Sequence, residues 1–351
     1  MKSLSKIAMT ALAIAFSAAT LLLACSKQTV PAVGPGTNTP GVNSPKRTIN
    51  VSNATALKDA LLNARPGDDI VLADGTYNGR FVIATTANGT ATDRIILRGS
   101  RNAILDGGSI STGYVLHAQG SFWDIKGITL QNGKKGIMAD GVQRTTIDGV
   151  KVHNIGEEAI HLRKFSSNNM VQNTEITNIG VLTPDYGEGI YIGTAKSNWA
   201  SVTGGEIDKS DSNRIINNKI GPNVAAECID IKEGTTGGLI QGNTFDAKGI
   251  TGANSADSWI DVKGNYYLIE NNIGHNSQPS ALTDGYQVNS AYSGWGSYNE
   301  FKNNTSNVHA SGYGINVRLT SSSGTAVGNK VYTSNTVNGA AKGVSNIPLS
   351  N

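Results

Sequence analysis

Short segments in which apolar and polar residues alternate recur through most of the chain, and helical periodicity is nearly absent. The clearest segments share the form apolar–x–apolar and lie 23 to 39 residues apart. They read GIMAD (136–140), EAIHLR (158–163), EGIYIG (188–193), ECIDIK (227–232), SWIDVK (258–263), DGYQVN (284–289) and YGINVR (313–318). Alternate residues of a strand point to opposite faces, so each segment predicts a short strand with one buried and one outward face.

A second repeat places an asparagine just after a strand. Its members are Asn173, Asn218, Asn243, Asn272, Asn304 and Asn335. Identical amides stacked one turn apart hydrogen-bond to each other and so satisfy buried polar atoms. Repeats of unequal length disfavour propellers and leucine-rich repeats, whose units are more regular. Together the two repeats predict an all-β fold, a single-domain right-handed parallel β-helix in which each turn adds one rung.

One segment departs from the strand pattern and predicts a helix that caps the N-terminal end of this solenoid. Its apolar face comprises Ala56, Leu57, Ala60 and Leu61. Asn53 or Thr55 is expected to cap its N-terminus, and Pro66 with Gly67 to end it. The first strand of the solenoid is expected directly afterwards. An end covered in this way does not template the addition of further strands.

The outward residues of the repeated strands form three columns of polar side chains. The middle column holds Met138, His161, Tyr191, Asp230, Asp261, Gln287 and Asn316. The column after it holds Asp140, Arg163, Gly193, Lys232, Lys263, Asn289 and Arg318, and the column before it holds Glu158, Glu188, Glu227, Ser258, Asp284 and Tyr313. Stacked like charges are unfavourable unless neighbouring columns neutralise each other or bind a ligand. This face therefore predicts a functional site.

The longest interval between repeats contains an insertion, residues 194–211, which follows one of these strands directly. Long loops beside a rigid face often carry function. We therefore expect Trp199 in this insertion to form one wall of a substrate groove.

The ends and the composition indicate where the protein works. Residues 1–24 are typical of a lipoprotein signal peptide, and LLAC ending at Cys25 predicts lipidation of that cysteine. Residues 25–47 are rich in Pro, Gly, Thr and Ser and predict a flexible tether, which leaves residues 48–351 for the domain. We expect a monomer outside the cytoplasm, bound to the outer membrane or cell surface only by its lipid. The formal net charge of +3 gives no case for nucleic-acid binding.

Two stretches resemble polysaccharide lyase family 6, the chondroitinase B and alginate lyase group. Residues 55–108 resemble its N-terminal helix and first strands, and ECIDIKEGTTGGLIQGNTF (227–245) resembles its Glu–x–x–x–x–Lys segment. The resemblance implies that Glu227 binds Ca²⁺ and that Lys232 is the general base. Ala225 stands where the family has a second glutamate, and no arginine follows on the next rung. Lyase families 9 and 1 are also β-helices with a Lys or Arg base and Asp-bound Ca²⁺, and the Asp-rich face resembles those equally well.

These observations predict an extracellular lyase that cleaves a uronic-acid polymer of the pectate, alginate or glycosaminoglycan type by β-elimination. The chemistry needs a cation on the substrate carboxylate and a base near the adjacent carbon. The expected metal ligands are Glu188, Glu227, Asp230 and Asp261. The expected catalytic groups are Lys232, Lys263 and Arg318, and the expected substrate-binding residues are Tyr191, His161, Arg163, Gln287, Asn289 and Trp199. Lys263 and Arg318 are expected to lower the pKa of Lys232.

Two other interpretations remain open from the sequence. Asp230 and Asp261, one rung apart, have the separation of about 5 Å that a retaining glycoside hydrolase uses. Alternatively, the polar face belongs to a surface protein that binds glycans without catalysis.

Overall fold

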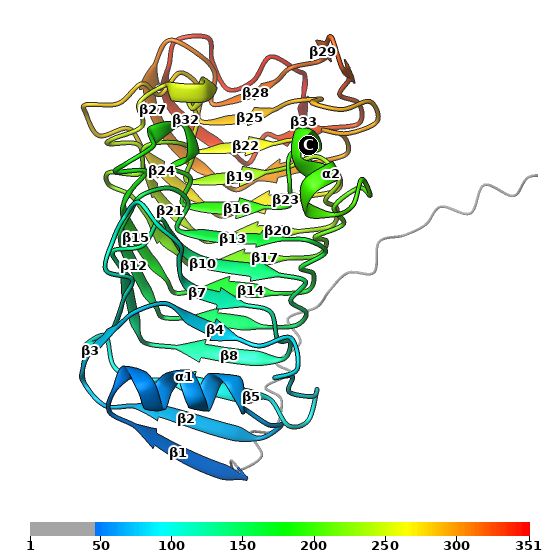
Figure 1. Ribbon diagram of the computed structural model, residues 1–351. Helices are drawn as coiled ribbons and strands as arrows, with labels where there is room; N and C mark the ends of the chain where they lie inside the picture. Colours follow the sequence, from blue (N-terminus) through cyan, green and yellow to red (C-terminus); the bar gives the residue numbers. More distant parts are fainter. Residues whose placement is uncertain (1–45) are drawn as a thin grey trace, which may run out of the picture. The chain divides into compact units, whose positions relative to one another are not determined.

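The computed structural model describes residues 46–351, so the signal peptide, Cys25 and all but the last residues of the tether lie outside the described residues. Three parallel sheets of twelve, ten and nine strands make up this part of the chain (Figure 1). Through most of the coil, each turn of the chain adds one strand to each sheet, and each strand pairs in parallel with its counterpart one turn later. The predicted right-handed parallel β-helix is confirmed.

The twelve-stranded sheet contains β1 (Arg47–Val51), β2 (Asp68–Leu72), β5 (Ile95–Arg98), β8 (Trp123–Lys126), β11 (Thr146–Asp148), β14 (Met170–Gln172), β17 (Arg214–Ile216), β20 (Leu239–Gln241), β23 (Leu268–Glu270), β26 (Glu300–Lys302), β31 (Lys330–Tyr332) and β33 (Leu349–Ser350). The ten-stranded sheet contains β3 (Gly75–Asn78), β6 (Ala103–Asp106), β9 (Thr129–Gln131), β12 (Lys151–Ile155), β15 (Glu175–Ile179), β18 (Lys219–Ile220), β21 (Thr244–Asp246), β24 (Ile273–His275), β27 (Thr305–Ala310) and β32 (Thr336–Ala340). The nine-stranded sheet contains β4 (Phe81–Ile83), β7 (Tyr114–Ala118), β10 (Lys135–Asp140), β13 (Ile160–Arg163), β16 (Ile190–Ile192), β19 (Ile229–Ile231), β22 (Ile260–Val262), β25 (Tyr286–Val288) and β28 (Ile315–Val317).

The remaining elements are short and lie between these strands. They are the helices α1 (Ala54–Leu62) and α2 (Trp199–Val202), the 3₁₀ turns η1 (Pro184–Tyr186), η2 (Lys196–Asn198) and η3 (Ala253–Ser255), and the antiparallel pair β29 (Thr320–Ser321) and β30 (Gly324–Thr325). Within residues 46–351, none of the helices has the length and apolar character needed to cross a membrane.

The seven repeated segments all lie in the nine-stranded sheet, from β10 to β28, and they pair in the register that the sequence predicts. Ile160 pairs with Ile190, which pairs with Ile229, and these inward side chains are fully buried. In the outward column between them, Tyr191 pairs with Asp230 and Asp230 with Asp261. A register shifted by one residue would expose the isoleucines, so burial of the apolar set determines which polar residues face outward.

The asparagine ladder is confirmed from Asn218 onward and is wrong at its first member. The amide of Asn218 donates to the Oδ1 of Asn243 at 2.9 Å, and the ladder continues in the same way through the later members. Asn173 is exposed, and its backbone has a φ of 52°. Thr174 takes the ladder position, and its N–H donates to the Oδ1 of Asn218. Asn173 therefore corresponds to Asn217, the first of two adjacent asparagines on the next rung.

The predicted helix is present as α1 at the N-terminal end of the described coil (Figure 1). Asn53 caps it, because its side chain accepts the N–H of Ala56 at 2.9 Å, and Leu57 and Leu61 are fully buried. The helix ends at Leu62, before the Pro-Gly pair expected to end it. The expectation that the first strand follows the helix is wrong, because β1 precedes it and pairs in parallel with β2.

Candidate active site

A cavity of about 270 Å³ lies on the outward face of the nine-stranded sheet, over the rungs from β16 to β28. Its lining residues are Asp185, Glu188, Glu227, Asp230, Lys232, Ala253, Asn254, Ser255, Asp261, Lys263, Gln287, Asn289 and Arg318. The cavity therefore brings together all four carboxylates expected to bind metal, all three expected catalytic cations and both expected amides. They come from residues 188 to 318 and converge because each rung presents the same outward positions.

Carboxylates outnumber cations in this cavity. Five carboxylate side chains line it, against the three cations Lys232, Lys263 and Arg318, which leaves an excess of two negative charges when all are ionised. An anionic polymer would be repelled by such a surface unless a cation compensated the excess. One divalent cation would carry the charge needed to balance this excess.

Three of the carboxylates are close enough to share one cation. Single oxygens of Glu188, Glu227 and Asp230 all lie within 4.8 Å of one another, and all three side chains are buried. The Oε2 of Glu188 is buried without a hydrogen-bond partner. Carboxylate oxygens are the ligands that Ca²⁺ prefers. The orphaned oxygen and the all-oxygen donor set fit a calcium ion at this position.

The protonation of two of these carboxyls reflects their burial among like charges. Burial raises the pKa of Glu188 to about 8, and the neighbouring Glu158 and Asp230 carboxylates contribute to this rise. Burial also raises the pKa of Glu227 well above its ordinary value, and Asp230 adds to this. When no cation is bound, both carboxyls hold protons to higher pH than an exposed glutamate does.

The repeated Asp and Lys of β19 and β22 form an alternating chain of charges. Lys232 Nζ lies 2.5 Å from Asp230, and Lys263 Nζ lies 2.8 Å from Asp230 and 2.6 Å from Asp261. Asp261 also accepts a hydrogen bond from Asn289 at 2.5 Å. The two columns thus neutralise each other across the rungs. Asp261, the fourth carboxylate expected to bind metal, belongs to this chain of charges and is not one of the three whose oxygens lie within 4.8 Å of one another.

The expectation of a lowered pKa for Lys232 is wrong. Burial does lower it, but the carboxylates of Asp230, Glu188 and Asp261 together outweigh burial and hold the pKa of Lys232 above its ordinary value. For Lys263, too, burial lowers the pKa but the carboxylates of Asp230 and Asp261 raise it, and the pKa lies above its ordinary value. Conversely, both ammonium groups hold the pKa of Asp230 below its ordinary value despite burial. The sequence showed stacked lysines but could not show that a carboxylate would lie between them.

Two of the expected substrate-binding residues, His161 and Tyr191, lie on the paired strands β13 and β16. The ring of Tyr191 lies between the ring of His161, at 4.3 Å, and the Nζ of Lys232, at 4.7 Å. His161 is buried, and its Nε2 donates to the carbonyl of Gly193 at 2.8 Å. Neither His161, 6% exposed, nor Tyr191, 9% exposed, lines the cavity, so contact of either residue with substrate stays a prediction. Arg163 lies further along the face and does not line the cavity.

The expectation that Trp199 forms a groove wall is wrong. Its indole is buried inside the insertion, where Nε1 donates to the carbonyl of Thr194 at 2.8 Å. The wall is instead built by η1 and η3, which contribute Asp185 and residues 253–255, and the amide of Asn254 donates to the carbonyl of Asp185. A sequence signal for η3 exists in residues 246–258, a stretch without strand alternation, although it is shorter than the insertion.

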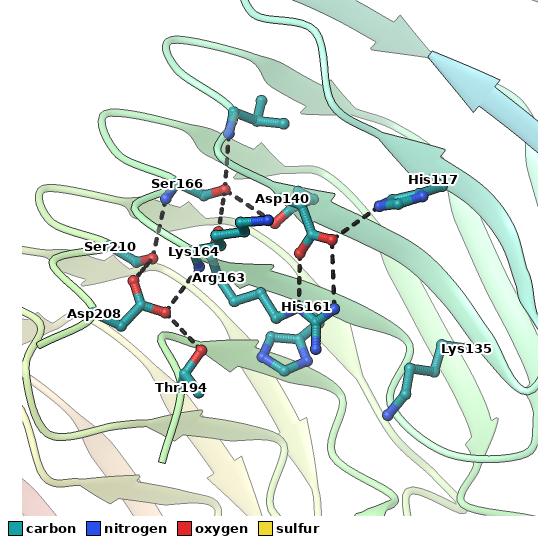
Figure 2. A network of polar contacts seen from close by, with 12 residues as sticks. His117, Lys135, Asp140, His161, Arg163, Lys164, Ser166, Thr194, Asp208 and Ser210 are labelled. Carbon is teal, nitrogen blue, oxygen red and sulfur yellow. Dashed lines mark hydrogen bonds and ion pairs between the residues drawn. The ribbon is translucent and has the colours of Figure 1, made fainter. Parts of the chain in front are cut away.

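The buried carboxylate of Asp208 helps to anchor the insertion to the coil (Figure 2). It accepts the backbone N–H groups of Lys164 and Phe165 at 2.8 and 2.7 Å. It also accepts the hydroxyl groups of Thr194 and Ser210 at 2.6 and 2.8 Å. One side chain therefore joins both ends of the insertion to the turn that follows β13.

Replacing Asp208 by alanine is expected to lower the free energy of unfolding by about 2–4 kcal/mol, because two part-buried N–H groups and the hydroxyl groups of Thr194 and Ser210 lose their acceptor. Chemical denaturation measures this loss. Glu206→Ala is the matched control, since it removes an exposed carboxylate from the same insertion. Equal stabilities of the two variants would contradict the anchoring role.

Comparisons with known proteins agree with this geometry. Residues 38–188 match the family model of the Pel9A-like right-handed β-helix region. The crystal structure of an alginate lyase from Paenibacillus sp. str. FPU-7 is 41% identical, with a TM-score of 0.76, over 86% of this chain and 99% of that chain. The crystal structure of pectate lyase Pel9A is 16% identical, with a TM-score of 0.56, over 83% of this chain and 80% of that chain, and supports the fold alone. A comparison with curated proteins finds no match.

The identity to the Paenibacillus enzyme extends over nearly all of that enzyme, and the cavity lies within the shared coil. Fold, sequence identity and the convergence of carboxylates and lysines on one face point to the same class of enzyme. The chain belongs to the right-handed β-helix polysaccharide lyases, in one family with the alginate lyase of Paenibacillus sp. str. FPU-7.

Proposed function

We propose that this lyase cleaves a uronic-acid polymer of the alginate type by β-elimination, with Ca²⁺ held by Glu188, Glu227 and Asp230. The observation that carries the proposal is the pair of buried glutamates, without a counter-charge of their own, beside Lys232 in one cavity. Alginate is the first candidate because the 41% identical neighbour is an alginate lyase. Pectate and glycosaminoglycans remain the alternatives to be compared.

The reaction breaks two bonds and forms a double bond. A base removes the proton from the carbon next to the uronate carboxylate, the C–O bond to the leaving sugar breaks, and the leaving oxygen takes up a proton. A bound divalent cation would neutralise the substrate carboxylate and stabilise the charge that develops on it. We assign proton removal to the deprotonated amine of Lys232, which is a minor form at neutral pH because the pKa of Lys232 is raised, and carboxylate binding to Lys263 and Arg318.

Tyr191 is suited to donate a hydrogen bond or a proton in this site. Burial raises the pKa of its phenol well above the ordinary value, and the charge of Asp230 raises it further. The hydroxyl therefore keeps its proton in the working pH range and acts as a donor rather than as a base.

The glycoside hydrolase and the non-catalytic glycan-binding interpretations agree less well with the structure and the comparisons. A glycoside hydrolase that uses Asp230 and Asp261 needs one of the two as a carboxylic acid with a raised pKa, but the two lysines hold the pKa of Asp230 low. Asp261 forms an ion pair with Lys263 and accepts a hydrogen bond from Asn289. A protein that only binds glycans does not agree with membership of a lyase family.

The test is a screen of uronate polymers for the ultraviolet absorbance of the unsaturated product. We expect absorbance to rise with alginate, to fall on addition of a chelator and to return on addition of Ca²⁺. Activity on pectate or a glycosaminoglycan alone would agree with the proposed mechanism but contradict alginate as the substrate. No absorbance with any uronate polymer, with Ca²⁺ present, would overturn the proposed function.

Lipid attachment at Cys25 and location outside the cytoplasm remain proposals, which mass spectrometry of the mature N-terminus tests.

A further inference from the structure

A row of cations continues from the cavity toward the N-terminal rungs of the same face. Lys232, Lys263 and Arg318 line the cavity, and Arg163 occupies the same outward column on β13. Arg163 lies two rungs from Lys232, about 10 Å at the usual strand spacing. Gly193 stands between them and has no side chain to obstruct the path. A larger residue is disfavoured there, because φ is 86° and an added Cβ would lie 2.5 Å from the methyl group of Thr235.

Arg163 is held in place by a closed set of contacts from three successive rungs (Figure 2). Its Nε donates to Asp140 at 2.7 Å, and His117 Nε2 donates to the other oxygen of Asp140 at 2.9 Å. Tyr114 packs edge-on against His117, with ring centroids 5.1 Å apart, and lies near the guanidinium of Arg163. An arginine paired with a carboxylate that is itself held by His117 presents its charge in a fixed direction.

The guanidinium is still available to a ligand. An arginine carries five N–H donors, and Asp140 takes only two of them. The side chain of Arg163 remains 21% exposed. A planar guanidinium that is already oriented binds a carboxylate with little further loss of entropy.

We propose that the substrate-binding surface extends beyond the cavity and that Arg163, oriented by Asp140, His117 and Tyr114, binds a further carboxylate of the polymer. The proposal rests on the proposed function, because it takes the ligand to be a uronate chain. One sugar of an extended 1,4-linked chain is close to one rung in length, so a chain lying along the solenoid passes over Gly193 and reaches Arg163. Arg163 is a positioning residue and takes no part in bond breaking.

The kinetic test compares substrates of different length. For Arg163→Ala we expect KM for alginate polymer to rise about tenfold, the size of a lost charge-assisted hydrogen bond, with kcat within twofold of wild type. KM for the shortest oligosaccharide that is cleaved should stay unchanged, and Arg163→Lys should recover part of the loss. Arg98→Ala is the matched control, because Arg98 pairs with Asp69 on the twelve-stranded sheet, away from the site. A KM that changes equally for short and long substrates, or not at all, would overturn the proposal.

A binding test separates this proposal from the proposed function. The inactive Lys232→Arg variant is run through gels that contain alginate, with and without Arg163→Ala, and its retardation is measured. Weaker retardation on loss of Arg163 supports the extended surface even if no uronate polymer is cleaved. Equal retardation overturns it even if wild-type enzyme is active. Thermal unfolding of each variant shows whether a loss reflects misfolding, and in that case Arg163→Lys gives the deciding comparison.

Discussion

Replacing Lys232 by alanine is expected to lower kcat by about 10²–10⁴-fold, the usual contribution of a general base. The side chain lines the cavity, and its Nζ lies 2.5 Å from Asp230 and 4.7 Å from the ring centroid of Tyr191. Initial rates of product absorbance on alginate measure the loss. Lys302→Ala is the matched control, because Lys302 pairs with Glu270 on the twelve-stranded sheet.

Lys232→Arg distinguishes a base from a charge. Arginine keeps the positive charge beside Asp230 but does not lose its proton in the accessible pH range. We therefore expect Lys232→Arg to be nearly as inactive as Lys232→Ala. Because Asp230 holds the pKa of Lys232 above its ordinary value, wild-type kcat/KM should rise as the pH moves from neutral into the alkaline range. Substantial activity in Lys232→Arg would show that this position supplies only charge.

Replacing Glu188 and Glu227 together by glutamine is expected to abolish the response of the enzyme to Ca²⁺. Two of the three carboxylates that lie within 4.8 Å of one another are lost, and amides are weaker ligands for a hard cation. For wild type, Ca²⁺ at about 100 times its Kd should stabilise the fold by about 2.7 kcal/mol through binding to the native state alone. Calorimetric titration and thermal unfolding measure binding and stabilisation. Glu270→Gln, on the twelve-stranded sheet, is the control and should respond like wild type.

The same substitutions change how stability depends on pH in the presence of a chelator. The pKa of Glu188 is about 8 in the folded protein, against 4.5 for the free side chain. Between these values the folded state binds more protons than the unfolded state, so the free energy of unfolding falls as pH rises from about 4.5 to about 8. Glu188→Gln removes this contribution and should flatten the fall. A slope in the variant equal to that of wild type would contradict the burial of an uncompensated carboxyl at this position.

The fold was predictable because it depends on a repeated pattern. Apolar residues at alternate positions determine which side of a strand is buried. Once Ile160 or Ile229 points inward, the residues next to it in the strand must point outward. For the same reason the sequence correctly grouped Glu188, Glu227 and Asp230 with the two lysines on one face. At the first member of the asparagine ladder, an asparagine and a threonine stand side by side, and the pattern could not choose between them.

The β-helix, its register and the set of charges on its outward face all follow from the amino-acid sequence alone. The pairing of those charges follows only from the folded structure. Lys263 reaches back across a rung to Asp230, and Asp230, lying between the two ammonium groups, raises the pKa of both lysines. The structure also decided that Trp199 is buried and that η1 and η3 form the cavity wall. Periodicity specifies the direction in which a side chain leaves the backbone, whereas the end point of a long side chain or a loop depends on contacts that no repeat encodes.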